Sequence, residues 1–289
     1  MRNITKTFWM LCFTSVMFTA CDSKPKIPST PAGSVNAVLS GVSNNKPEVI
    51  WAAMPKSYQT DINKIVAKWA GLMEKDTYNS YMKLVKRLGS AVKQKREMIM
   101  NTMMKMAPPD KKKQLGPMFD SAVAMIDAIS SSQIMDHGKM LNADVGKFVS
   151  RHGETLMKSF FAINPAARRN LDQMSSMKFV QASMEGDKAK LNMTKDGKVM
   201  GPPLAFVKIE GRWVPSMLQG KWAPGIAKAN STLDSAKAKA ADVNKKMLTA
   251  LPIFEKFVVS FEEVKNEAQL SSFPIRLMAL QQQLQGLMR

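Results

Sequence analysis

The sequence predicts a mainly α-helical protein, a helical bundle with a small inserted antiparallel β-meander (α+β). On either side of residues 177–222, apolar residues recur at three- and four-residue spacing, which is the period of an amphipathic helix. Within residues 177–222 the period falls to two, and glycine-containing turns separate short apolar runs. That pattern is typical of β-hairpins. Hydrophobic residues make up 45% of the chain and charged residues 22%, so we expect a packed fold rather than disorder.

Residues 35–176 are predicted to form the helical bundle. Four amphipathic stripes fall in this region; Pro108-Pro109 interrupts the series, and the last stripe stops before Pro165. Ser57, which follows Pro55, is predicted as the N-cap of the first helix because its hydroxyl can accept from a free backbone N–H. The stripes are Ile62–Met73, Tyr81–Val92, Phe119–Ile129 and Leu141–Phe160.

Residues 177–222 are predicted to form the antiparallel meander. Glu185-Gly186-Asp187, Lys195-Asp196-Gly197 and Glu210-Gly211 are the turn signals between its strands. The predicted strands are Met177–Met184, Lys188–Thr194, Leu204–Ile209 and Arg212–Met217. Phe206–Trp213, an apolar strand, a glycine turn and a tryptophan, is similar to a strand pair in exported cone-shaped NTF2-like domains.

Residues 223–289 are predicted to be C-terminal helices that pack on the bundle. Apolar residues recur every seven positions in two registers, one starting at Ile226 and an alanine-rich one starting at Ala229. Pro252 is predicted to kink or end this helix. An alanine-rich seam allows close helix approach, so an intramolecular helix hairpin is the favoured interpretation. Self-association or docking of a partner helix is the alternative.

The N-terminus has the layout of an export signal. Arg2 and Lys6 precede an apolar run, Phe8–Phe18, that is too short for a permanent membrane span. Phe18-Thr19-Ala20-Cys21 then places a large apolar residue at −3 and small residues at −2 and −1 before a cysteine. The motif resembles the lipobox of bacterial lipoprotein precursors. This resemblance implies that residues 1–20 are removed, that Cys21 is acylated, and that the chain is anchored through lipid; several acyl chains together anchor stably.

The residues that follow predict where the anchored protein sits. Asp22 resembles the enterobacterial signal for retention in the inner membrane, which favours its periplasmic face over the outer membrane. Residues 21–34 carry three prolines, Pro25, Pro28 and Pro31, and no apolar period, so we expect a lipidated, semi-extended tether. Trp51–Asp61 also resembles a stretch in uncharacterised exported proteins of aquatic bacteria.

The cysteines and histidines exclude several kinds of chemistry. Cys12 leaves with the signal and Cys21 is acylated, so the processed chain would have no disulfide and no thiol nucleophile. His137 and His152 are the only histidines, near Asp136 and Glu154; a hydrolytic dyad or metal pair is conceivable there. His152 falls on an apolar stripe, however, and His137 in a predicted glycine-containing turn. Since no hydrolase, metalloprotease or nucleotide-binding motif is present, we expect no enzyme and no cofactor.

Methionines and basic residues are unusually abundant. Five of the 25 methionines fall within residues 98–106. Packing, or an adaptable apolar surface, is the favoured interpretation. A soft-metal site for Cu(I), formed by Met100, Met103 and Met104, or a site for a small apolar ligand is the alternative.

The net charge is +19, falling to +17 once Arg2 and Lys6 are removed with the signal. Such a charge favours anionic headgroups or wall polymers, since export makes nucleic acid an improbable partner. The basic residues predicted to contact an anionic surface are Lys86, Arg87, Lys93, Lys95, Arg96, Lys111, Lys112 and Lys113. The sequence therefore predicts a non-enzymatic envelope lipoprotein that binds a protein, a lipid surface or a wall polymer.

Overall fold

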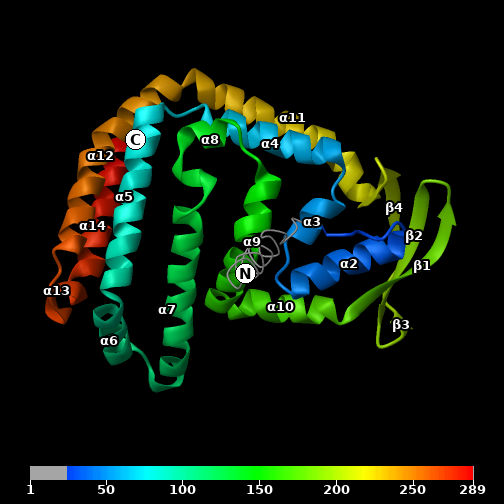
Figure 1. Cartoon of the computed structure of the whole chain (residues 1–289), viewed down its shortest axis with the longest axis horizontal. Coiled ribbons are helices and arrows are strands. Elements are labelled where there is room, and N and C mark those ends of the chain that lie inside the picture. The colour runs from blue at the N-terminus through cyan, green and yellow to red at the C-terminus, as the bar shows by residue number, and fades with distance from the viewer. Residues whose placement is uncertain (1–24, 289) are drawn as a thin grey trace, which may run out of the picture.

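A computed structural model describes residues 25–288, so the predicted signal peptide, Cys21 and Asp22 lie outside the described residues. The described chain is mainly helical with one small antiparallel sheet, and the predicted fold class is confirmed (Figure 1). The helices up to the sheet are α2 (Pro31–Ser43), α3 (Glu48–Ala53), α4 (Lys56–Ala70), α5 (Lys75–Gln94), α6 (Arg96–Met106), α7 (Pro109–Ser130), η1 (Gln133–Met135), α8 (His137–Leu141), α9 (Val145–Ile163) and α10 (Pro165–Ser175). The strands and later helices are β1 (Met177–Glu185), β2 (Lys188–Lys195), β3 (Lys198–Val199), β4 (Leu204–Ile209), β5 (Arg212–Pro215), α11 (Ser216–Ala238), α12 (Ala240–Glu262), α13 (Glu267–Ser271) and α14 (Phe273–Met288).

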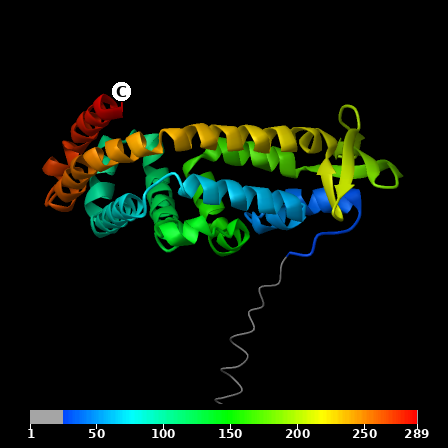
Figure 2. The ribbon, with the colours of Figure 1, turned by 90° about the horizontal axis from the view of Figure 1, so that it is seen from above.

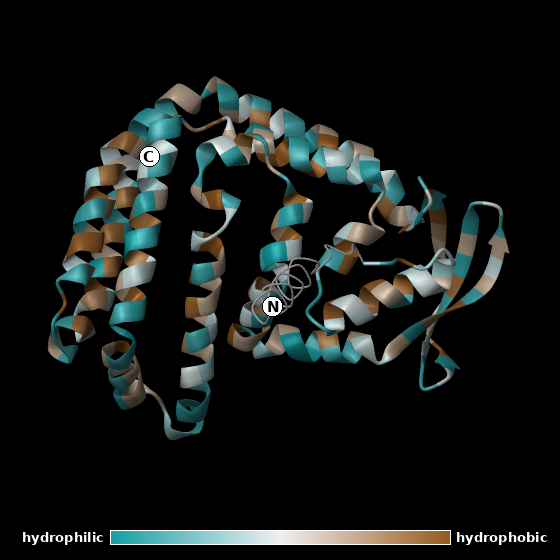
Figure 3. Cartoon of the chain, in the orientation of Figure 1, coloured by the Kyte–Doolittle hydropathy of each residue, from teal (hydrophilic) through white to brown (hydrophobic). Residues whose placement is uncertain are grey.

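The helices form an arched, flat molecule. Helices α4 and α11 run side by side along the top of the arch, α5, α12 and α14 lie together at one end, and the sheet forms the other end (Figure 1). Seen from above, the molecule is a shallow slab (Figure 2). Hydrophobic and hydrophilic positions alternate along the long helices (Figure 3), as expected where each helix buries only one face.

Helices α2 and α4 begin at residues that the sequence analysis did not identify. Helix α2 starts at Pro31 with Thr30 as N-cap, whose hydroxyl accepts from the Gly33 N–H at 3.3 Å. The predicted tether is therefore too long, since residues 31–34 belong to a helix and Ser34 is buried. The predicted N-cap Ser57 is also wrong. Helix α4 starts at Lys56 after Pro55, because a proline before the first turn sacrifices no helical hydrogen bond.

The sheet follows the predicted hairpins closely. Its order is β1-β2-β4-β5, all antiparallel, with β3 paired to β2. Asp196-Gly197 and Glu210-Gly211 have positive φ at both positions, which two-residue hairpin turns require and glycine permits at low cost. One face packs on α2 through a core of Ala189, Leu191, Phe206 and Trp213. The predicted meander extends too far, because residues 216–222 are the start of α11.

The C-terminal helices depart from the predicted arrangement. The helical break falls at Lys239, where φ is −106° and ψ is 4°, and Pro252 lies inside α12 without ending it. Helix α11 packs along α4, whereas α12 packs on α5 and α14. The expected alanine-seamed hairpin is therefore wrong, because each half of the heptad pattern contacts a different helix. Phe261, Val264 and Leu270 form a core with Ala91 at this end of the molecule.

Candidate functional site

An apolar hollow lies between α4 and α11, above the start of α9. We call it the apolar groove; it encloses about 750 Å³, and its lining is almost wholly apolar. Its walls are Ile65, Val66 and Trp69 of α4, Gln133 and Ile134 of η1, Met140 of α8, Val145 and Phe148 of α9, and Gly225, Lys228, Ala229, Thr232 and Leu233 of α11. Trp69 remains 46% exposed, so the groove opens to solvent. Its volume falls within the range of about 300–1,000 Å³ that is typical of small-molecule pockets.

Polar and aromatic contacts hold α11 against α4 beside the groove. On one side of it, Trp222 stacks on Tyr58 and donates from Nε1 to Asp61 Oδ2 at 2.9 Å. On the other side, Lys68 Nζ contacts Asn230 Oδ1 at 3.2 Å and Asp234 Oδ1 at 2.8 Å. The two helices are thus fixed together by directional contacts rather than by continuous packing of apolar side chains. Burial raises the pKa of Tyr58, and the carboxylates of Asp61 and Glu210 add to the shift.

Small residues on α11 leave the groove empty between these two contact points. Gly225 and Ala229 are one helical turn apart on its groove side, and a Cβ added at Gly225 would meet nothing within 4 Å. No residue of α11 is buried. Lys228 is the cationic lining residue of the groove; it is exposed and forms no ion pair with any residue in the described range.

The two histidines lie in different places and neither has a carboxylate partner among residues 25–288. His137 is not in a turn as predicted; it begins α8, is buried, and its Nε2 lies 3.1 Å from the Ala70 carbonyl oxygen. Because that carbonyl can only accept, Nε2 carries the proton. The neighbouring Asp136 caps α8 instead. His152 lies beside the Phe148 ring, and Glu154 pairs with Lys158.

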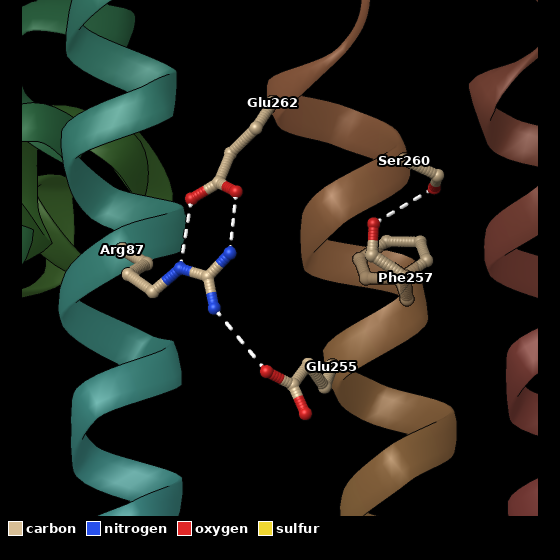
Figure 4. Close-up of polar contacts among 5 residues, drawn as sticks. All are labelled: Arg87, Glu255, Phe257, Ser260 and Glu262. Atoms are coloured by element: carbon tan, nitrogen blue, oxygen red, sulfur yellow. Dashed lines mark hydrogen bonds and ion pairs between the residues drawn. The ribbon is translucent and has the colours of Figure 1, made fainter.

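Most of the predicted anionic-contact residues are engaged within the protein. Arg87 donates from Nε and Nη2 to both oxygens of Glu262, at 3.0 and 2.6 Å, and reaches Glu255 as well (Figure 4). The Glu262 carboxylate has a pKa below its ordinary value, chiefly because it accepts from Arg87. The other engaged residues are Lys93 with Asp127, Arg96 with Asp120, Lys111 with Asp110, and Lys95, whose Nζ donates to the Val264 carbonyl.

The remaining three predicted residues, Lys86, Lys112 and Lys113, form no ion pair in the described part of the chain. Lys112 and Lys113 lie in the first turns of α7 and Lys86 on α5. Two free lysines near one helix end and a third on another helix form a smaller basic surface than the sequence indicated.

The methionine-rich helix α6 divides between core and surface. Met98 packs against the core formed by Phe261 and its neighbours. Met103 and Met104 are 37% and 38% exposed, and Met100 is half-buried. These side chains are far from the apolar groove, whose lining contains no residue of α6. The predicted methionine site and the groove are therefore separate places.

The sequence analysis missed the groove altogether. Its alanine register predicted close helix contact at Ala229, whereas the structure leaves space there. The one local signal was Gly225 preceding Ala229 by four residues, which places two minimal side chains on the same face of α11.

No helix within 25–288 combines the length and apolarity needed to cross a membrane. Over the same range, no three His, Cys, Asp or Glu side chains gather as a metal site would require.

No protein-family model, no curated protein and no solved structure matches this chain.

Proposed function

We propose that this protein is a lipid-anchored envelope protein that binds without catalysis, and that the apolar groove is its binding site. The ligand is a single apolar chain with an anionic end, such as a free fatty acid. Cys21 anchors the protein, with the periplasmic face of the inner membrane favoured. The observation that carries this proposal is the groove between α4 and α11, held open by contacts at Trp222 and Lys68.

The chemistry of the groove supports this ligand class. Burying an apolar chain releases water from both surfaces, at about 25 cal/mol per Å² of apolar area. The walls offer the ligand almost no polar atom with which to pair, so a sugar or peptide backbone buried there would lose its hydrogen bonds to water. Lys228 is the one basic residue among those that line the groove, and it forms no ion pair in the described chain.

A fluorescent fatty acid tests the groove directly. The mature chain with Cys21 replaced by Ser is titrated with a dansyl-labelled fatty acid, alongside two substitutions on α11. Ala229→Trp fills the groove, whereas Ala227→Trp adds the same side chain at an exposed position outside it. We expect Ala229→Trp to weaken binding by about tenfold or more, and Ala227→Trp to leave it unchanged. Equal binding by all three proteins would reject the groove as the site.

The anionic end is tested separately through Lys228. Lys228→Gln is expected to weaken binding of the fatty acid while leaving binding of the corresponding fatty alcohol unchanged, because only the acid carries a charge to pair with the ammonium group. An equal loss for both ligands would show that Lys228 contributes through its methylene stem instead.

The anchor is tested by metabolic labelling with a radioactive fatty acid. We expect label in the wild-type protein and none in the Cys21→Ala protein, which should accumulate as an unprocessed precursor. Label retained after Cys21→Ala would remove the lipid anchor from the proposal, without affecting the groove.

A further inference from the structure

A second hollow, of different chemistry, lies on the opposite side of the first turns of α9. We call it the cationic cavity; it encloses about 800 Å³ between α3, α4, α9 and the β4–β5 turn. Its lining includes Trp51, Lys56, Lys147, Arg151, Glu210 and Arg212. Pro25, the first described residue, also lies on its wall, so the cavity adjoins the place where the chain leads back to Cys21.

Four basic side chains line the cavity without a partner. Lys56, Lys147, Arg151 and Arg212 come from three different elements, and none forms an ion pair with a residue between 25 and 288. This contrasts with Arg87 and Arg96 elsewhere on the surface, which are both paired with carboxylates. Arginine and lysine groups that line one cavity from separate elements, and that are not paired with carboxylates, make a site for an anion.

The carboxylates of the same cavity form no ion pair with these cations. Asp144 accepts from the Lys147 backbone N–H at 2.9 Å as the N-cap of α9. Glu210 accepts from the Ser57 backbone N–H at 3.0 Å, and hydrogen bonding from the Ser57 side chain and then from its backbone lowers the pKa of the Glu210 carboxyl group. Glu48 is the third acidic group of the lining. Two of the three carboxylates therefore accept hydrogen bonds at helix N-termini, and none is paired with one of the four basic groups of the lining.

The apolar wall of the cavity is fixed by a close contact between α3 and α9. Trp51 lies directly against Gly146, where an added Cβ would come within 2.4 Å of the indole Nε1. The Gln59 amide, another lining group, donates to the Trp51 carbonyl at 2.7 Å. Because these contacts are internal to the fold, the cavity is shaped before any ligand binds.

We infer that the cationic cavity binds a phosphate ester. Arg151 and Arg212 hold the phosphate oxygens by charge-assisted hydrogen bonds, for which guanidinium geometry is well suited. Lys56 and Lys147 add charge, and Trp51 offers an apolar surface to the esterified part of the ligand. The ester is either the headgroup of a membrane lipid, bound beside the anchor, or a soluble compound. This site is independent of the apolar groove, since the two share no lining residue.

The test uses the full chain in maltoside micelles, which contain no phosphate. Calorimetry measures binding of two probes, glycerol phosphate and a short-chain phosphatidylglycerol. Two variants remove the same charge: Arg151→Gln with Arg212→Gln in the cavity, and Lys112→Gln with Lys113→Gln on α7. We expect the cavity variant to bind both probes at least about tenfold more weakly, and the α7 variant to bind as the wild type does.

The two probes identify the source of the ester. Binding of both probes supports a lipid headgroup, and binding of glycerol phosphate alone supports a soluble ester. If the wild type binds neither, or if the cavity and α7 variants lose affinity equally, the inference is overturned. Ser150→Glu, which places a carboxylate in the cavity at an exposed position, gives a second loss of binding that does not depend on removing arginine. Ala229→Trp should retain phosphate binding, which separates this result from that of the groove.

Discussion

The rings of Tyr58 and Trp222 lie parallel, with their centroids 3.8 Å apart and their planes inclined by 4°. Tyr58 is buried near the start of α4, and Trp222 belongs to the second turn of α11. This stacked pair is one of the two attachments between helices that enclose the apolar groove. Because α11 buries no residue of its own, its position depends on such attachments more than on a hydrophobic core.

Trp222→Ala should therefore loosen α11. It removes the stacking and the hydrogen bond to Asp61, and we expect the free energy of unfolding in urea to fall by about 2 kcal/mol. Trp222→Phe retains an aromatic ring but not the donor, so about 1 kcal/mol should be lost. Limited proteolysis within α11 should accelerate in the same order. An Ala variant as stable and as resistant as the wild type would mean that α11 is held elsewhere.

Gly146→Ala should destabilise the contact between α3 and α9. The new methyl group would meet the Trp51 indole at 2.4 Å, and overpacking of this kind typically costs about 1–3 kcal/mol. Gly220→Ala is the matched control, because a Cβ there meets nothing within 4 Å and alanine favours a helix by up to about 1 kcal/mol. Thermal unfolding should therefore show shifts of opposite sign, and a stabilised Gly146→Ala protein would contradict the close approach.

Glu262 should make stability depend on acid pH. Its pKa in the folded protein lies below the ordinary carboxyl value of 4.5, so the pair with Arg87 is fully stabilising above that value and is lost as pH falls through the lower folded pKa. Glu262→Gln should thus lose less stability than the wild type between about pH 5 and pH 2. Glu263→Gln removes a neighbouring carboxylate without an ion pair in the described chain, and its pH profile should parallel that of the wild type.

Replacing Met100, Met103 and Met104 by Leu tests the alternative soft-metal site. These swaps nearly conserve volume, so each should change stability by less than about 1.5 kcal/mol. If the methionines serve as packing and surface, the wild type and the triple variant should respond identically to Cu(I) titrated against a competing chelator. A tight wild-type site that disappears in the triple variant would instead establish thioether ligands, because a methylene group cannot donate to the metal.

The sequence was sufficient to predict those turns, strands and helices whose conformation depends on residues close by in the chain. Asp196-Gly197 and Glu210-Gly211 specify tight turns through their own backbone preferences, so the strands beside them were predicted nearly to the residue. The long amphipathic stripes likewise predicted helices, since their period belongs to the sequence itself. The ends of helices and strands were predicted less accurately. The predicted strand ran to Met217, whereas β5 ends at Pro215, because the apolar run itself contains no residue that marks the end of the strand.

The sequence by itself therefore determined the fold class, the turns of the sheet, the surplus of positive charge and the lipobox-like motif at Cys21. Only the tertiary structure decided what the alanine-rich face of α11 does. In sequence, the alanine register that starts at Ala229 indicates a seam for close packing. In the fold, Trp222 and Lys68 join α11 to α4 through residues more than 160 positions apart, and the small side chains between those joints leave the groove empty. Nor does the sequence show which basic side chains form ion pairs. Arg87 is paired with Glu262, whereas Arg151 and Arg212 line a cavity and form no ion pair in the described chain. Pairing across such separations depends on the final packing of helices, which no local pattern encodes.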